Sequence, residues 1–395
     1  MKYFSFILMF VIGVNDHRLL AEGAAGFHHR LFDGKSLNGW TIENDCTVDL
    51  VDDCVRLKSG TGWVRHDSRL RDFELHLEWK ALQATRYDAG IFFRANLEGK
   101  PFPTGGYQVN LLDGGEGNIA NVAGAQSQGL CKPAGEWNVF DLRVIGDSAS
   151  LKINGQDAWK VTGLKELDGW LGFQIEVPEG GQFLLRNIDV TEIGYSSLFN
   201  AQDLQGWEGA DSSADACWSV EQGLLVCSGK KGPWLRSQLE YDNFDLRLDY
   251  RVSNGGNSGV YIRVPADGNH HRDNDTQPAA GIEVQILDDT APEHAALKDY
   301  QYSASIYDFT GASPRNSRPL GDWNSLEINC QGQHITTWHN GVCVTNLSAD
   351  QLPSLGLRLT KGFLGLQNHS TVVQFRNIRI GSAVTAVEPE ARQKP

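Results

Sequence analysis

The 395-residue chain is poor in methionine and in positive charge. It has 2 Met, and 35 Lys and Arg stand against 49 Asp and Glu, so that the formal net charge is -14 at pH 7. This surplus argues against a nucleic-acid or anionic-membrane partner, because both need cationic side chains that neutralise phosphate. The 7 cysteines show no zinc-site spacing, and no glycine-rich dinucleotide fingerprint is present. The sequence therefore predicts no nucleic-acid partner, no membrane partner and no bound dinucleotide.

An apolar run stands at the start of the chain but is short. Residues 3–14 follow Met1 and Lys2, and precede a polar break and small residues at 21–25. The run is too short to span a bilayer comfortably, so we expect residues 1–24 to be a signal peptide and the protein to be periplasmic or secreted. The alternative is an uncleaved hydrophobic anchor.

The second half of the chain repeats the first. The segment LFDGKSLNGW at 31–40 returns as LFNAQDLQGW at 198–207, and later landmarks recur in the same order. Ordered agreement of this kind indicates two copies of one domain. We place the first domain at 25–194, the second at 195–382 and a disordered charged tail at 383–395. The short linker predicts that the two domains touch and hold a fixed orientation.

Both halves are built from segments in which apolar and polar residues alternate, such as 73–79 and 244–250. Alternation with period two marks half-buried antiparallel strands, and Asn-Gly and Gly-Gly pairs between them mark turns. Only short stretches, at 163–168 and 291–299, are compatible with helix. The predicted fold class is all-β, with two tandem jelly-roll β-sandwiches.

The cysteines permit two interpretations. Three pairs flank predicted hairpins or lie on neighbouring strands, which would suit disulfides in an oxidising compartment. Buried free thiols are an almost equally good interpretation. The pairs are Cys46 with Cys54, Cys217 with Cys227, and Cys330 with Cys343, which leaves Cys131 odd.

Polar side chains stand on one face of three strands in the second half. They are Tyr261 and Arg263, Glu283 and Gln285, and Gln367 and His369. If the three strands belong to one sheet, these groups converge on its open concave face, where jelly rolls often bind sugars. Each residue taken alone also fits an ordinary solvent-facing position, and Arg263 fits a structural ion pair with a carboxylate such as Glu283.

Glu283 and His369 together would supply a general base and a general acid near neutral pH. The first half has Gln108 and Glu176 at the corresponding places, so we expect the second domain to be the catalytic one. His270 and His271 resemble metal ligands only in residue type, and we favour a solvated loop there.

The segments 198–207, 257–263, 283–288, 365–369 and 375–378 together resemble the 3-keto-disaccharide hydrolase domain family, also described as 3-keto-glucoside lyase and hydratase domains. The resemblance covers both copies and implies a concanavalin-like or LamG-like jelly roll. The first copy departs from the pattern at Gln108, Asn110 and Glu176. The candidate substrate-binding residues are Asn257, Ser258, Tyr261, Gln285, Asp288, Tyr307 and Gln367.

The resemblance implies cleavage of a glycoside that carries a ketone at C3. A base removes the acidified C2 proton, the anomeric group leaves by β-elimination, and addition of water completes hydrolysis. Glu283 or His369 would be the base and the other the acid, while Arg263 or a divalent metal ion would polarise the ketone. No cofactor is certain. A separate sugar oxidoreductase would supply the oxidised glycoside or oligosaccharide.

Two alternatives remain from the residues. A non-catalytic carbohydrate-binding protein would use both concave faces only to hold glycans. An ordinary retaining or inverting glycosidase needs two carboxylates on one site, and Glu283 has no clear second member on its face, because Asp288 points the other way by parity.

Overall fold

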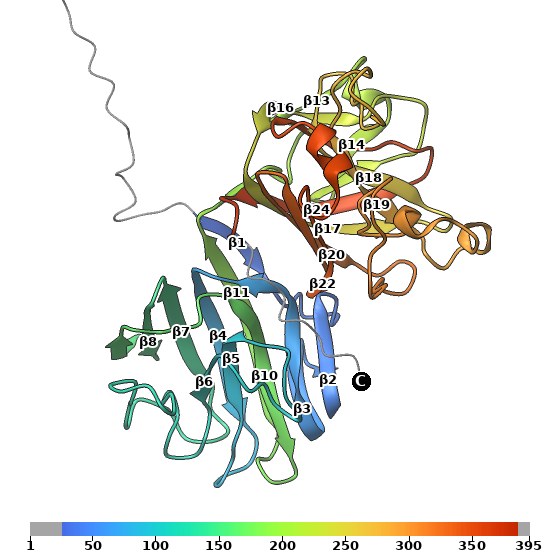
Figure 1. The fold of residues 1–395 in the computed structure, drawn as a ribbon. Coiled ribbons are helices and arrows are strands. Elements are labelled where there is room, and N and C mark those ends of the chain that lie inside the picture. Colours follow the sequence, from blue (N-terminus) through green and yellow to red (C-terminus); the bar gives the residue numbers. More distant parts are fainter. Residues whose placement is uncertain (1–25, 386–395) are drawn as a thin grey trace, which may run out of the picture.

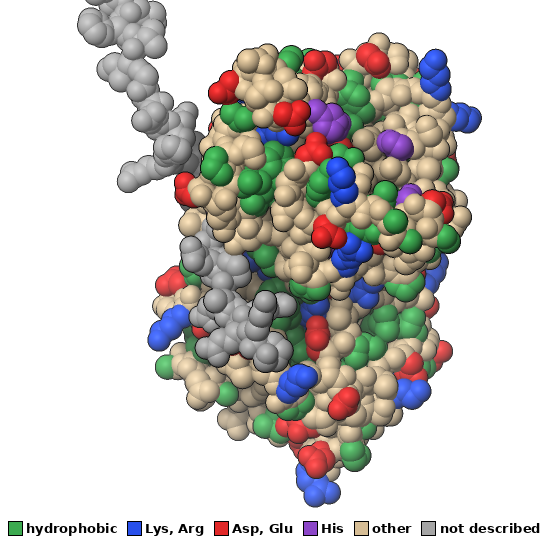
Figure 2. All heavy atoms as spheres, turned by 45° about the vertical axis from the view of Figure 1, so that its right-hand side comes forward, with side chains coloured by type: hydrophobic (Ala, Val, Ile, Leu, Met, Phe, Trp, Pro, Cys, Tyr) green, Lys and Arg blue, Asp and Glu red, His purple; other side chains and the backbone are tan. Residues whose placement is uncertain are grey.

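The computed structural model describes residues 26–385, and the chain forms two antiparallel β-sandwiches in succession (Figure 1). No helix in this range is long and apolar enough to cross a membrane. The predicted signal peptide lies outside the described residues. On the face in Figure 2, acidic and basic side chains are interspersed.

The first domain forms one continuous sheet of eleven strands that wraps around its own core. Nine strands follow the order β6-β5-β10-β3-β11-β4-β7-β8-β9, while β1 pairs with β11 and β2 with β3. The bounds are β1 (Gly26–Arg30), β2 (Trp40–Val51), β3 (Cys54–Leu70), β4 (Phe73–Ala81), β5 (Gly90–Ala95), β6 (Tyr107–Asn110), β7 (Asn138–Ile145), β8 (Ser148–Ile153), β9 (Gln156–Val161), β10 (Gly169–Val177) and β11 (Phe183–Ile193).

The second domain forms two sheets, β14-β15-β24-β17-β20-β21-β22 with β12 on β24, and β13-β16-β23-β18-β19. Its strands are β12 (Tyr195–Ser197), β13 (Trp207–Gly209), β14 (Trp218–Glu221), β15 (Leu224–Cys227), β16 (Leu235–Tyr241), β17 (Phe244–Val252), β18 (Asn257–Val264), β19 (Ile282–Leu287), β20 (Asn324–Gln331), β21 (His334–His339), β22 (Val342–Ser348), β23 (Gly362–Leu366) and β24 (Val373–Gly381). Four 3-10 turns are η1 (Ala214–Ala216), η2 (Pro292–His294), η3 (Asp299–Gln301) and η4 (Pro353–Leu357).

A single strand explains why the first domain has one sheet and the second has two. In the first domain β3 runs unbroken and pairs with β11 at one end and with β10 at the other. In the second domain its counterpart is divided into β15 and β16, which pair with β24 and β23. Gly232 and Pro233 lie in the gap, and proline cannot donate a hydrogen bond to a strand ladder. The two copies therefore share one jelly-roll plan.

The period-two prediction is confirmed. Along β4 buried and half-buried residues alternate without exception. Helix is absent from 163–168, where Gly163 has a φ of +86° and the chain forms a loop, so that expectation is wrong. Residues 291–299 contain only η2 and the start of η3.

The two sandwiches touch through a buried ionic cluster, as the short linker predicts. Glu192 accepts from Arg247 at 2.8 Å and lies 2.7 Å from an Arg379 nitrogen, and all three side chains are at most 2% exposed. Burial raises the pKa of Glu192, but the two guanidinium groups outweigh it and hold that pKa well below its ordinary value. The cluster fixes how one domain sits on the other.

The hairpin cysteines follow the thiol interpretation. The Cys46 thiol donates to the Trp63 carbonyl at 3.7 Å and that of Cys217 to the Pro233 carbonyl at 3.4 Å. The tail prediction is wrong at its start, because Val384 is buried and exchanges two backbone hydrogen bonds with the Asn329 side chain. Residues 386–395 lie outside the described part.

Candidate active site

The smaller sheet of the second domain carries the candidate site. Within β19, Ile282, Val284 and Ile286 pack into the core, which turns Glu283 and Gln285 to the opposite face. The parity prediction for this strand is confirmed. Glu283 lies opposite Tyr261 of the neighbouring strand β18.

A cavity of about 420 Å³ opens over this face. Its lining combines one carboxylate, four imidazoles, four amides and a phenol with two leucines. The lining residues are Asn257, His270, His271, Glu283, Gln285, Leu287, His294, Leu297, Gln301, Tyr307, Gln367 and His369. Histidine side chains reach the surface of the second domain in Figure 2. The cavity brings together both predicted acid-base residues, Glu283 and His369.

Glu283 is the most buried charged group of this cavity lining, with a side chain only 3% exposed. Its Oε2 lies 3.1 Å from Nε2 of His270. Room for the carboxylate depends on Gly259, because a Cβ there would lie 2.1 Å from Oε1 of Glu283. A buried carboxylate needs a partner of this kind, since desolvation otherwise disfavours its charge.

His270 is held so that it shares a proton with Glu283. Its Nδ1 lies 3.2 Å from the Gly268 carbonyl, which can only accept, so Nδ1 carries a hydrogen. Burial lowers the pKa of His270, but the hydrogen bond and charge of Glu283 outweigh it and raise that pKa above its ordinary value. Glu283 therefore favours the protonated form of His270.

Gln367 offers an unused acceptor to the cavity. Its amide nitrogen donates to the Tyr261 hydroxyl at 3.0 Å, whereas its buried Oε1 has no partner among the described residues. Buried polar atoms normally have a hydrogen-bond partner, so a free acceptor in a cavity wall suits a ligand hydroxyl. Tyr261 itself stacks on His270 with ring centroids 5.0 Å apart.

The amides of Gln285 and Asn257 are neighbours 3.2 Å apart. With its nitrogen turned toward the carboxylate, Gln285 donates to Oε1 of Glu283 at 3.3 Å and to the Ser258 carbonyl at 3.2 Å. Tyr307 closes another part of the wall, where its hydroxyl accepts from Gln301 at 3.0 Å. These groups give the cavity both donors and acceptors for sugar hydroxyls.

The prediction that Arg263 faces the site is wrong. The pairing of β18 with β23 shifts register between Tyr261 and Val264, and Arg263 has a φ of +52°. Its buried guanidinium donates instead to the Asp242 carbonyl at 2.7 Å. Arg94 binds the Arg71 carbonyl in the same way in the first domain, so the arginine has a structural role in both copies.

Ser258 and Asp288 also lie outside the cavity lining. The Ser258 hydroxyl is buried and donates to the Gln367 carbonyl at 2.8 Å. Asp288 accepts from the Gly255 amide at 2.9 Å and from Thr290, and these hydrogen bonds outweigh burial and lower its pKa. Both residues therefore shape the segments that carry the site rather than its wall.

For His270 the sequence favours a solvated loop, and this prediction is wrong, because the side chain lines the cavity beside Glu283. The residue lies in the connection between β18 and β19, and both strands carry candidate residues. A loop that joins two neighbouring strands with candidate residues has to lie at one end of those strands, close to the site. This connection was the sequence feature that could have indicated His270. His294 and Gln301 come from the long segment after β19, where no periodicity marks them.

Comparison with known proteins agrees with this architecture. A family model described as the 3-keto-alpha-glucoside-1,2-lyase-like domain matches residues 28–191 and again residues 194–381. The chain belongs to this family. It contains two tandem copies of the domain, as the sequence predicts, and membership supports an enzyme of the glycoside hydrolase kind.

Three known proteins are each similar to half of this chain or less. A 3-keto-disaccharide hydrolase of Bacteroides thetaiotaomicron is 29% identical over 225 residues, which cover 47% of this chain and 78% of that protein. A solved Parabacteroides distasonis protein described as a candidate glycosyl hydrolase is 28% identical with a TM-score of 0.41, covering 48% and 98% of the two chains. The carbohydrate binding module CBM66 of Bacillus subtilis is 14% identical with a TM-score of 0.32, covering 38% and 95%.

The first copy of the family domain has the corresponding strands but carries different side chains at the corresponding site. Gln108, which stands in the place of Glu283, donates to Gln174, and Gln174 donates to Glu176 at 2.8 Å, so a neutral amide replaces the carboxylate of the pair. Phe102 packs near Phe92, with ring centroids 6.3 Å apart, where the second copy has His270 stacked on Tyr261. This copy has no counterpart of the His270 and Glu283 pair.

The metal alternative gains no support from residue geometry. Within residues 26–385, no group of three or more His, Cys, Asp or Glu side chains is arranged to hold a metal ion. His271 pairs with Asp308 at 2.9 Å, and Nδ1 of His294 lies 2.9 Å from the Asp288 carbonyl. Three of the four cavity histidines, His270, His271 and His294, are thus engaged with protein groups.

Proposed function

We propose that this chain cleaves 3-keto-glycosides in the cavity of its second domain, by removal of the C2 proton, β-elimination of the anomeric group and addition of water. The observation that carries the proposal is the buried Glu283 carboxylate, held by His270 in the cavity wall. Family membership and the name of the Bacteroides relative support the substrate class.

Glu283 is the proposed base. A ketone at C3 acidifies the C2 proton because the electron pair left on C2 is delocalised into the carbonyl as an enolate. The carboxylate takes that proton, and its contact with His270 at 3.1 Å holds it in position in the cavity wall. A positioned base of this kind contributes about a hundredfold to ten-thousandfold in rate.

His369 is the proposed acid. When the C1 to oxygen bond breaks, its electrons go to the leaving oxygen, the enolate pair forms the C1=C2 double bond and the C3 ketone returns. His369 lies in the same cavity lining and is solvent-exposed, so it can give a proton to that oxygen and regain one from water. Water then adds its oxygen to C1 while C2 regains a proton, which yields the free 3-keto sugar.

The ketone oxygen needs a donor other than Arg263. Asn257 is the neighbouring neutral amide, because both N–H groups of Gln285 are directed at Glu283 and at the Ser258 carbonyl, and an N–H group of Asn257 directed at the developing enolate oxygen would stabilise it. Gln367 would accept from a sugar hydroxyl through its free Oε1. These roles use only groups that the cavity presents.

The substrate must be oxidised at C3 by another enzyme, so a C3 sugar oxidoreductase is the expected functional partner. We also propose that the protein works in the periplasm or outside the cell. The proposed signal peptide at residues 1–24 supports this location.

Product formation from a 3-keto-glucoside and from its unoxidised parent tests the proposal. The intact protein should cleave only the keto sugar, and Glu283→Gln should abolish cleavage. Gln108→Asn, at the matched position of the first copy, should leave turnover unchanged. Binding of either sugar without cleavage would overturn the enzyme and support the carbohydrate-binding alternative.

A further inference from the structure

The contact between the two domains joins two different faces. Ser68 and Arg69 of β3 in the first domain meet Ser325 and Glu327 of β20 in the second, at 3.3 Å and 2.6 Å. The guanidinium of Arg69 also lies 4.0 Å above the ring of Trp338 on β21. We call residues 65–69 the strand face and residues 325–340 the hairpin face.

Because the chain is a repeat, the strand face has a counterpart in the second domain. The backbone hydrogen bond from Asp67 to Gly39 is matched by one from Gln238 to Gly206. Trp40 pairs with His66 as Trp207 pairs with Ser237. The second strand face therefore consists of Arg236, Ser237, Gln238, Leu239 and Glu240.

The hairpin face has a counterpart in the first domain. The backbone bond from Asn340 to Ser325 is matched by one from Asn154 to Val139. Strand pairing sets Asp141 opposite Lys152 as it sets Glu327 opposite Trp338. The second hairpin face is therefore formed by Val139, Asp141, Lys152 and Asn154.

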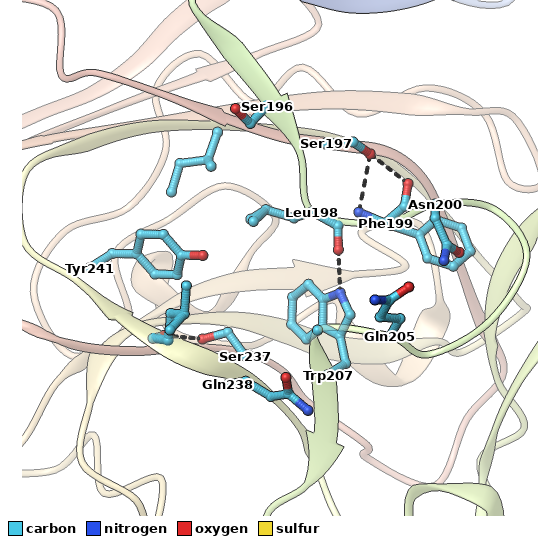
Figure 3. Close-up of a pocket in the computed structure, with 13 residues that line it drawn as sticks. Ser196, Ser197, Leu198, Phe199, Asn200, Gln205, Trp207, Ser237, Gln238 and Tyr241 are labelled. Atoms are coloured by element: carbon cyan, nitrogen blue, oxygen red, sulfur yellow. Dashed lines mark hydrogen bonds between the residues drawn. The ribbon is translucent and has the colours of Figure 1, made fainter. Parts of the chain in front are cut away.

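Within the described chain Gln238, Leu239 and Glu240 of the second strand face and Lys152 of the second hairpin face are exposed, whereas Ser237 is buried. The second strand face borders a groove of about 660 Å³, shown in Figure 3, whose wall includes Leu198, Trp207 and Tyr241. Leu239 in this groove is 67% exposed. The second hairpin face borders a groove of about 450 Å³ that includes Lys152 and Asp141. An exposed leucine in an apolar groove favours a protein partner.

The two uncovered faces complement each other. If the two uncovered faces met in the same way as the strand face and the hairpin face, Leu239 and half-buried Val139 would take the places of Ser68 and Ser325. The place of Arg69 above Trp338 is taken by Glu240 beside Lys152, an opposite-charge pair. An apolar contact next to a charge pair is the composition of a specific protein interface.

The charges on these faces are available for such a contact. Glu240 and Lys152 now make only exposed pairs, with Lys361 and Asp157, both at 3.6 Å. Exposed pairs of this kind contribute little, so a partner can replace them. Asp141 takes the place of Glu327 and would also approach Glu240, so that Lys152 has to outweigh this like-charge pair.

We propose that a second copy of this chain docks head to tail, with the second strand face of one molecule on the second hairpin face of the next. The contact repeats the internal one between molecules. Because it joins two different faces, it leaves one face of each kind open at the ends and builds chains or rings rather than a closed twofold dimer.

Sedimentation velocity over a concentration series tests the proposal with charge reversal. The intact protein should associate further as concentration rises. Lys152→Glu alone should lose association, because Glu240 then meets only carboxylates. Glu240→Lys alone should lose less, because the new ammonium meets Asp141 as well as Lys152. An equimolar mixture of the two variants should recover it, since each contact in an alternating assembly again joins opposite charges. Both positions are exposed, and melting curves of the variants should match that of the intact protein.

Leu239→Asp should also lose association, independently of the charge reversals. An intact protein that stays monomeric at the highest soluble concentration would overturn the proposal. Association that survives Lys152→Glu would also overturn it, because another surface would then hold the copies together, and so would a mixture that fails to restore association.

Discussion

Glu283 and His270 form a buried ion pair, 3.1 Å apart, in a wall that also carries His369 and the amides of Asn257, Gln285 and Gln367. The pair ties strand β19 to the loop that precedes it. Its chemistry makes the cavity sensitive to pH, because the pKa of His270 is raised while the carboxylate remains its hydrogen-bond acceptor.

Replacement of His270 should affect stability in a defined pH window. A raised folded-state pKa means that the pair contributes stability fully below the unfolded histidine pKa, about 6.5, and loses it as pH rises through the folded value. His270→Gln should therefore lower the melting temperature at pH 6 more than at pH 9. It should also reduce kcat by roughly a hundredfold. Equal melting losses at both pH values would contradict the ion pair.

The Gly259→Ala substitution should impair the site without a large loss of folding. Its Cβ would lie 2.1 Å from the Glu283 carboxylate and displace it. We expect a loss of activity of at least a hundredfold at a stability cost of about 1–3 kcal/mol.

Gly90→Ala in the first domain is the matched control for this substitution. Its Cβ would collide with the Gln108 amide at 2.2 Å, so the folding cost should be similar. Turnover should be retained. A comparable loss of activity in both variants would show that overpacking, rather than displacement of Glu283, is responsible.

How much of the site could be predicted depended on where each residue stands. Glu283 and Gln285 lie within a regular strand, so period-two parity placed them correctly. Arg263 lies within the register shift between Tyr261 and Val264 and has a positive φ, and such an irregularity turns a side chain away from the face that parity predicts. His270 belongs to a loop without periodicity, whose return over β19 depends on tertiary packing. The fold was more predictable, because it follows from many alternating segments and from the repeat.

The role of His369 can be separated from that of Glu283 through the leaving group. A general acid matters most when the leaving oxygen is strongly basic. His369→Ala should therefore reduce cleavage of a 3-keto-disaccharide by about a hundredfold or more. It should change cleavage of a 3-keto nitrophenyl glycoside much less, since nitrophenolate leaves without a proton. Glu283→Gln should reduce both, and equal losses for both substrates in His369→Ala would contradict its assignment as the acid.

The buried cluster between the domains should dominate the response of stability to single charge removals. Glu192→Gln leaves Arg247 and Arg379 buried without their shared carboxylate, and breaking a buried pair from one side costs about 3–5 kcal/mol. Asp189→Asn, which removes the partner of the largely exposed Arg30, should cost at most about 1 kcal/mol. Urea unfolding followed by tryptophan fluorescence measures both. Because the lowered pKa of Glu192 makes its contribution persist above the unfolded value and fade as pH falls, the difference between Glu192→Gln and the intact protein should shrink in acid. A Glu192→Gln protein as stable as the Asp189→Asn protein would show that the cluster orients the two sandwiches without stabilising them.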